Sequence, residues 1–165
     1  MQAEKILIRP ADSKELDELN RVIEAAVMSW KLPERVKRLS LPSYRYDATD
    51  FRALQIIIAV AGDKIVGVAA WEEADQKEAP QGSRALLLHG IYVDPARHRH
   101  GIGRLLFKAA VKATRSQGFD GLLVKAQESA DGFFLSQGMQ RLEPADHARH
   151  YANRFWKAVT AGEPK

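Results

Sequence analysis

Apolar residues near the N-terminus recur with the period of a helix. Over residues 13–30 they stand three or four positions apart, which predicts an amphipathic helix that Pro33 ends. Residues 34–41 predict a second, shorter helix, and we expect it to stop near Pro42 because proline interrupts helical hydrogen bonding. The next stretch, residues 43–50, is polar and aromatic, which is typical of a loop.

Strand signals dominate the rest of the chain. Seven segments are expected to be strands: 5–9, 54–61, 64–71, 85–93, 121–126, 139–142 and 151–159. Gly62 and Asp63 form a two-residue turn between the second and third segments, which predicts a β-hairpin. The fourth segment is apolar enough for a buried central strand, and Gly90 within it indicates a bulge or a close approach of the main chain. Residues 72–83 are acidic, which is typical of a solvated loop.

Two further helices are expected. One begins near Ile102, carries an apolar face as far as Ala113 and ends at Gly118. The other spans residues 129–137 and is closed by Gly138. The element order is then β-α-α-β-β-β-α-β-α-β-β, which predicts an α+β fold with helices over one sheet.

Composition narrows the class of protein. At 165 residues we expect one domain over residues 1–159, followed by a flexible tail over 160–165. The chain has no cysteine, which excludes disulfides, thiolate metal ligands and a cysteine nucleophile. No apolar run approaches the roughly 18 residues of a membrane span, and the first residues lack a signal-peptide pattern. We therefore expect a cytoplasmic protein without a membrane partner.

The net charge of +4 is mild, but it is unevenly placed. Six Lys and Arg and no acid lie between Pro95 and Phe119, which leaves 19 basic and 21 acidic residues elsewhere. Gly101 and Gly103 stand where the predicted helix begins, and a helix start offers unpaired N–H groups and a positive dipole end. Glycines let that main chain approach a phosphate closely. The segment therefore predicts a phosphate site, and the basic stripe along the helix suits several phosphates unless it is merely the solvated face.

Other ligands fit the segment less well. It lacks the third glycine of a dinucleotide fingerprint and the Gly-Lys-Ser/Thr of a nucleotide P-loop. Residues 97–100 are densely basic, yet no nucleic-acid motif accompanies them, so we expect no nucleic-acid partner. Two histidine pairs have metal-ligand spacing but no convincing third ligand nearby, so we expect no metal; they are His98 with His100 and His147 with His150.

The same segment resembles a known family. Val93, Pro95, Gly101 and Gly103, with a strand before and a helix after, resemble the Val-x-Pro-x-x-Arg/Gln-x-x-Gly-x-Gly/Ala coenzyme motif of the GNAT superfamily of N-acetyltransferases. The predicted element order resembles the family fold over essentially the whole chain. The resemblance implies a central, splayed, mostly antiparallel sheet flanked by helices.

The resemblance also implies an activity and a set of coenzyme contacts. It implies an acyltransferase that moves an acetyl group from acetyl-CoA directly to a primary amine of a small molecule or peptide, and family members often form homodimers. The residues that it assigns to the coenzyme are Ile91, Tyr92, Val93, His98, Arg99, His100, Gly101, Ile102, Gly103, Arg104 and Phe134. The amides near the glycines would hold the pyrophosphate, and the strand before them would pair with the pantetheine.

Two positions depart from the family pattern. His98 stands at the Arg/Gln position, which weakens the side-chain support of the turn. Phe134 stands where many members carry a tyrosine that protonates the leaving thiolate, and a phenyl ring has no proton to give. Either water or another group, such as Tyr151, serves instead, or the protein binds the coenzyme without efficient transfer.

Candidates for proton handling and acceptor binding follow from the resemblance. His89 lies four residues before Val93, where aralkylamine-acetylating members carry a histidine, and an unperturbed imidazole titrates near pH 6.5. We expect Glu73 to share the catalytic work, and Glu72 and Trp30 to contact the acceptor. Each of these residues also has a purely structural interpretation, as a packed histidine, a solvated strand end or an aromatic core residue.

Overall fold

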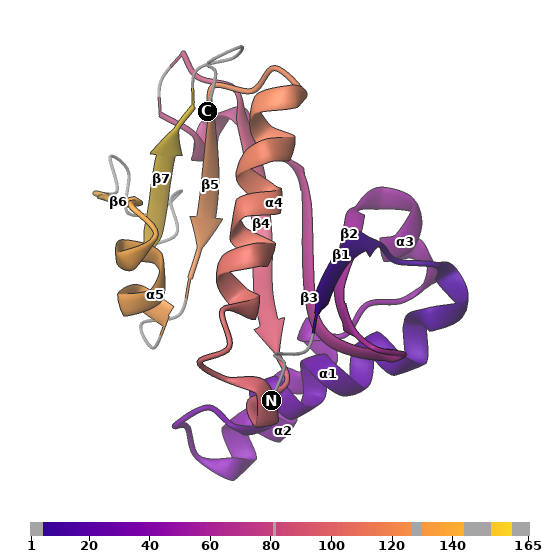
Figure 1. Ribbon diagram of the computed structural model, residues 1–165. Helices are drawn as coiled ribbons and strands as arrows, with labels where there is room; N and C mark the ends of the chain where they lie inside the picture. The colour runs from indigo at the N-terminus through magenta and orange to yellow at the C-terminus, as the bar shows by residue number, and fades with distance from the viewer. Residues whose placement is uncertain (1–4, 81, 127–129, 144–152, 160–165) are drawn as a thin grey trace. The chain divides into compact units, whose positions relative to one another are not determined.

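The computed structural model describes residues 5–80, 82–126, 130–143 and 153–159 (Figure 1). Its strands are β1 (Ile6–Pro10), β2 (Gln55–Ala61), β3 (Lys64–Glu73), β4 (Ala85–Val93), β5 (Gly121–Lys125), β6 (Gln140–Leu142) and β7 (Arg154–Ala158). Its α-helices are α1 (Leu16–Met28), α2 (Glu34–Tyr44), α3 (Ala48–Ala53), α4 (Ile102–Ser116) and α5 (Asp131–Ser136). None of these described helices has the length and apolarity needed to cross a membrane.

The predicted α+β class is confirmed. The described strands form one sheet in the order β1-β2-β3-β4-β5-β7-β6. The chain divides into two compact units, the first made of residues 1–70 and 91–106 and the second of 71–90 and 107–165. The single domain expected over 1–159 stays a prediction, and the tail expected at 160–165 lies outside the described residues.

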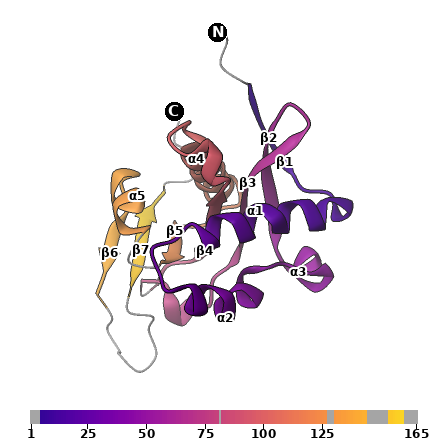
Figure 2. The same cartoon turned by 90° about the horizontal axis from the view of Figure 1, so that it is seen from below.

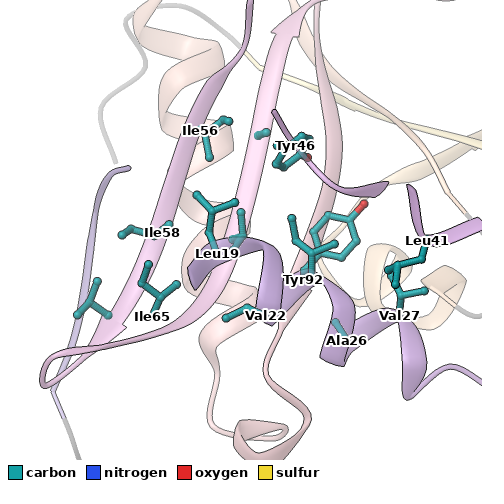
Figure 3. Close-up of a cluster of buried hydrophobic side chains, with 14 residues drawn as sticks. Leu19, Val22, Ala26, Val27, Leu41, Tyr46, Ile56, Ile58, Ile65 and Tyr92 are labelled. Atoms are coloured by element: carbon teal, nitrogen blue, oxygen red, sulfur yellow. The ribbon is translucent and has the colours of Figure 1, made fainter. Parts of the chain in front are cut away.

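The first unit is built on an antiparallel pair of strands. β1 runs against β2, with Ile6 opposite Ala61 and Pro10 opposite Ile57. Helices α1 and α2 lie side by side (Figure 2). The apolar face of α1 forms a buried cluster with side chains of β2, β3 and β4 (Figure 3). The helical period of the sequence therefore marks the face of α1 that is buried.

The start of the first predicted helix is a short 3-10 turn. Asp12 and Glu15 form a reciprocal capping box, in which each side chain accepts a hydrogen bond from the main-chain N–H of the other residue. Residues 13–15 then take the tighter 3-10 geometry, and α1 runs from Leu16 to Met28. The predicted helix over 13–30 is thus correct in place but differs in its first and last turns.

Two expectations about the following segment are wrong. Helix α2 continues through Pro42 to Tyr44, because a proline this close to the C-terminus removes one hydrogen bond and leaves the earlier turns intact. The expected loop over residues 43–50 contains the start of α3 instead. Asp47 and Asp50 form a second capping box there, with N–H to oxygen distances of 2.9 and 2.8 Å.

The second unit contains the pairing partners of β5. β4 runs parallel to β5 from Ala85, opposite Gly121, to Leu88, opposite Val124. β7 lies antiparallel on the other side of β5, and β6 pairs with β7. A small cluster of apolar side chains around Leu123 is buried in this unit.

Strand β3 is longer than the sequence indicates. It extends to Glu73, so Glu72 and Glu73 belong to a strand and not to the solvated loop expected over 72–83. A 3-10 turn follows at Gln76–Glu78, and Glu78 is buried, with its carboxylate 3.1 Å from the Lys125 ammonium. The connection between β3 and β4 is therefore held by packing and charge, which the acidic composition of the segment does not reveal.

Candidate functional site

The segment after β4 is fixed to the sheet where it leaves the strand. The Asp94 N–H donates to the Val66 carbonyl on β3 at 2.9 Å. The Asp94 carboxylate in turn accepts from the Ala96 N–H at 3.0 Å, which caps the 3-10 turn Pro95–Arg97. The Asp-Pro pair of the predicted motif therefore sets the point at which the chain turns toward α4.

Two residues of this turn have left-handed backbone conformations. Arg99 has a φ of 69° and Gly101 a φ of 77°. Glycine adopts this conformation readily, whereas for an arginine it costs about 1–2 kcal/mol. Left-handed residues in a turn point successive N–H groups to one side and form a concave anion site. A strained non-glycine residue at this place is typical of a functional turn.

The start of α4 supplies further donors. The first helical bond runs from the Leu105 N–H to the Gly101 carbonyl at 3.1 Å, so Gly101 is the N-cap. The N–H groups of the next three residues, 102–104, then have no acceptor within the helix. They lie at the positive end of the helix dipole, which favours an anion.

Packing holds this helix start in place. Ile102 is buried, and it lies against Gly67 of β3. A Cβ atom added at Gly67 would be 2.9 Å from the Ile102 side chain and 3.0 Å from that of Leu106. The glycine therefore lets the first turn of α4 approach the strand more closely than any other residue would allow.

The side chains of the turn face solvent, and its arginines carry positive charge. His98, Arg99, His100 and Arg104 are all exposed, and no acid occurs from residue 95 to residue 119. The donors and the charge thus suit a pyrophosphate. The residues predicted to bind the coenzyme at the turn lie together, and their binding role stays a prediction.

On the strand before the turn, the three predicted coenzyme residues differ in burial. Ile91 and Val93 are half-buried, whereas Tyr92 is 5% exposed and belongs to the core of the first unit (Figure 3). Burial raises the pKa of the Tyr92 hydroxyl. Tyr92 can therefore offer a ligand only its main chain, because its side chain is occupied in packing.

The second unit holds a pair of titratable side chains that the sequence did not pair. His89 Nε2 lies 2.5 Å from Glu72 Oε2, and the side chains are 32% and 41% exposed. Glu73, which we expected to share the catalytic work, lies 3.7 Å from the Arg84 guanidinium instead. The Ala74 N–H donates to the Ala85 carbonyl at 2.9 Å, and this register places Glu72 diagonally across from His89. The pairing of Glu72 with His89 could not be predicted from the sequence, because it depends on this register.

Phe134 is packed among other aromatic rings. It is 4% exposed. The centroid of its ring lies 5.2 Å from that of Phe133, 5.9 Å from that of Phe155 and 6.4 Å from that of Phe107. These four phenylalanines hold α5 against β7 and α4 within the second unit. The side chain at position 134 therefore serves packing, and it brings no proton donor.

Trp30 lies in a chain of aromatic contacts within the first unit. Its ring meets Tyr44 edge to face at 5.2 Å, and Tyr44 meets Tyr92 at 6.3 Å. The Tyr46 hydroxyl is buried in the same core and has no hydrogen-bond partner among the described residues. Burial raises the pKa of that hydroxyl.

The described part of the chain also bears on the metal question. Within residues 5–80, 82–126, 130–143 and 153–159, no three His, Asp or Glu side chains gather in a way that could hold a metal ion. His147, His150 and the alternative acid Tyr151 lie outside these residues.

Comparison with known proteins agrees with the turn and the sheet. The model of the acetyltransferase (GNAT) family matches residues 23–139. The chain therefore belongs to the GNAT family of acetyltransferases, as the resemblance of its motif predicts. A search of curated proteins gave no match.

Solved structures share the fold at low identity. The PaiA N-acetyltransferase of Thermoplasma acidophilum, in complex with coenzyme A, has a TM-score of 0.75 and 13% identity, over 94% of this chain and 99% of that one. A GNAT acetyltransferase of Brucella melitensis, in complex with acetyl-CoA, has a TM-score of 0.67 and 18% identity, over 99% of this chain and 94% of that one. A GCN5-related N-acetyltransferase of Rhodopseudomonas palustris has a TM-score of 0.71 and 19% identity, over 96% of this chain and 99% of that one. At these identities the likeness establishes the fold.

Proposed function

We propose that the protein is an N-acetyltransferase that moves an acetyl group from acetyl-CoA to a primary amine of a small molecule or peptide. The observation that carries the proposal is the turn after β4, in a chain that belongs to the GNAT family. Left-handed Arg99 and Gly101 precede a helix whose first N–H groups have no acceptors in the helix. That donor set fits the pyrophosphate of a coenzyme A molecule.

Different residues of the chain would bind different parts of acetyl-CoA. The N–H groups of residues 102–104 would hold the pyrophosphate, and the exposed cations of the turn would add long-range attraction. Strand residues 91–93, of which the first and last are half-buried, would pair with the pantetheine through their main chain. Phe134 would contribute only indirectly, because its ring is buried among phenylalanines.

His89 is the proposed proton acceptor for the amine. An amine reaches the site as an ammonium ion and must lose a proton before its nitrogen attacks the thioester carbonyl. The carbon–nitrogen bond then forms as the carbon–sulfur bond breaks. The nitrogen loses its second proton to water to give the amide, and the thiolate takes up a proton from water. The chain has no cysteine to carry the acetyl group, which favours this direct transfer.

Trp30 is the proposed contact of the acceptor. The cytoplasm is the proposed location, because acetyl-CoA is made and used there.

A second function is favoured by one observation. Phe134 stands where the family pattern has a tyrosine acid, and the rings around it include no proton donor. A protein that binds coenzyme A without efficient transfer would have this arrangement. The two functions share the coenzyme site and differ in turnover.

Calorimetric titration with acetyl-CoA, followed by a screen of primary amines with thiol release as the readout, tests both functions. We expect binding at micromolar concentration and release of coenzyme A above the rate of hydrolysis for at least one amine. For that amine, His89→Ala should lower kcat by about a hundredfold, as for the loss of a general base. Binding without any turnover would support the second function, and no binding would contradict both.

A further inference from the structure

We infer that Glu72 is a positioning residue that fixes His89 in one tautomer, so that Nδ1 is the atom that accepts the proton of the amine. The inference rests on the proposed role of His89 and adds to it the partner, the reacting atom and its orientation. The family resemblance instead implies an acceptor contact for Glu72 and a share of the catalytic work for Glu73.

The contact assigns the tautomer for an ionised Glu72 and a neutral His89. Glu72 Oε2 and His89 Nε2 are 2.5 Å apart, which is a short hydrogen bond between the ends of two side chains on β3 and β4. An ionised carboxylate only accepts hydrogen bonds, so the hydrogen must be on Nε2. A neutral imidazole carries a single N–H, and Nδ1 therefore keeps its lone pair.

The position of both side chains suits a catalytic task better than a structural one. They are 32% and 41% exposed, so the pair is reached by solvent and adds little to the stability of the fold. Each stands on a strand and not on a flexible loop, which limits the directions that the imidazole can take.

The neighbouring carboxylate provides the contrast. Glu73 is next in the chain, is 56% exposed and lies 3.7 Å from Arg84, with its charge already opposed by a guanidinium. Successive strand residues point to opposite faces of a sheet, so only one of the two carboxylates can meet His89. The register selects Glu72.

The proton balance of the proposed step is closed. The ammonium of the acceptor gives one proton to Nδ1, and the amine nitrogen forms a bond to the acetyl carbon while the thiolate leaves. His89 then carries two N–H groups and a positive charge, which the Glu72 carboxylate opposes at Nε2. The acylated nitrogen loses its second proton to water and becomes a neutral amide. Nδ1 also returns its proton to water, the thiolate takes one proton from water, and no group is oxidised or reduced.

Nuclear magnetic resonance of the protein labelled with ¹⁵N-histidine tests the contact without any acceptor. We expect a low-field proton resonance coupled to Nε2 of His89, identified by its loss in His89→Gln. Glu72→Gln should remove that resonance, and Glu73→Gln should retain it. A resonance coupled to Nδ1, its absence from the wild type, or its persistence in Glu72→Gln would overturn the inference.

Steady-state kinetics with an amine from the screen test the consequence for catalysis. Glu72→Gln should lower kcat by about tenfold to a hundredfold and leave KM for the amine within about twofold. Glu72→Asp should fall between the wild type and Glu72→Gln, because its carboxylate is one methylene short of the contact. A larger loss of kcat in Glu73→Gln than in Glu72→Gln would contradict the assignment. If no amine is acetylated, the proposed function fails, and the resonance still decides on Glu72.

Discussion

Gly121 shows how strictly one residue can be required by its neighbours. A Cβ atom at this position would lie 2.3 Å from the Trp156 ring and 2.8 Å from the Lys157 carbonyl oxygen. The carbonyl belongs to the main chain of β7, which pairs with β5 and cannot move away independently. Trp156 therefore covers the start of β5 only because residue 121 has no side chain.

We predict that Gly121→Ala lowers the free energy of unfolding by about 3 kcal/mol, the upper range for overpacking. Urea denaturation measures the change. Gly132→Ala is the matched control, because a Cβ at position 132 meets nothing within 4 Å and alanine favours the α5 helix. The control should be unchanged or slightly stabilised, and an equal loss in both variants would show that the contact with Trp156 does not matter.

At the same scale, the sequence indicated candidate residues but not their partners. The roles of His89, Glu72 and the turn residues stay predictions, although all of these residues were named from the family resemblance. The pairing of Glu72 with His89 was not predicted, because it depends on the register of β3 against β4, and a shift of one residue would have placed Glu73 there. Strand patterning does not determine register when both residues at the strand end are acidic.

Among the secondary-structure elements, α1 shows how a helix start is fixed by charge. The Glu15 carboxylate receives two hydrogen bonds from the Arg9 guanidinium, at 2.9 and 2.7 Å, and one from the Asp12 N–H at 2.8 Å. The hydrogen bonds from Arg9 are the main cause of a Glu15 pKa of about 2, below its ordinary value of 4.5. Because the folded state prefers the ionised form, this stabilisation is complete above pH 5 and is lost as the pH falls from about 4.5 toward 2.

We predict that Glu15→Gln lowers the free energy of unfolding by about 1 kcal/mol at pH 7, a value discounted for solvent screening. The difference from the wild type should shrink steadily as the pH falls below about 4.5. Denaturation at a series of pH values measures it. Glu24→Gln, which removes an exposed carboxylate 2.8 Å from Arg45, should change stability by no more than about 0.5 kcal/mol. A pH-independent difference for Glu15→Gln would contradict the prediction.

Element boundaries were less predictable than element types. All seven strands were expected near their observed places, because alternation and turn residues marked them. Pro42 predicts the end of α2, yet the helix continues for two more residues. Helix α3 was missed because its six residues are too few to show a period, and its signal is the Asp47 and Asp50 pair alone.

The family and its fold were predictable for the molecule as a whole, because both depend on the order of elements and on one well-spaced motif. The sequence did not show which ligand the excess positive charge binds. The whole excess lies on the turn and α4, and the remainder of the chain is slightly acidic. A ligand for these residues should therefore stabilise the folded state specifically.

We predict that acetyl-CoA at a hundred times its Kd adds about 2.7 kcal/mol to the free energy of unfolding. For a chain of this length, the melting temperature should rise by roughly 5–10 °C. Differential scanning fluorimetry measures the shift, and Gly101→Val should reduce it because a β-branched residue disfavours a φ of 77°. Gly62→Val is the matched control, with a φ of 63° and open space in the turn between β2 and β3. It should lose stability and keep the shift; loss of the shift in both variants would contradict the proposed site.

Binding through main-chain groups would make the turn after β4 tolerant of mutation. Every residue except proline presents the same N–H group, so His98, Arg99 and His100 can change during evolution without removing a donor from residues 102–104. An alanine scan of this turn would consequently underestimate its importance. A variant intended as a null control in cells should instead replace Gly103 by proline, which deletes a donor itself.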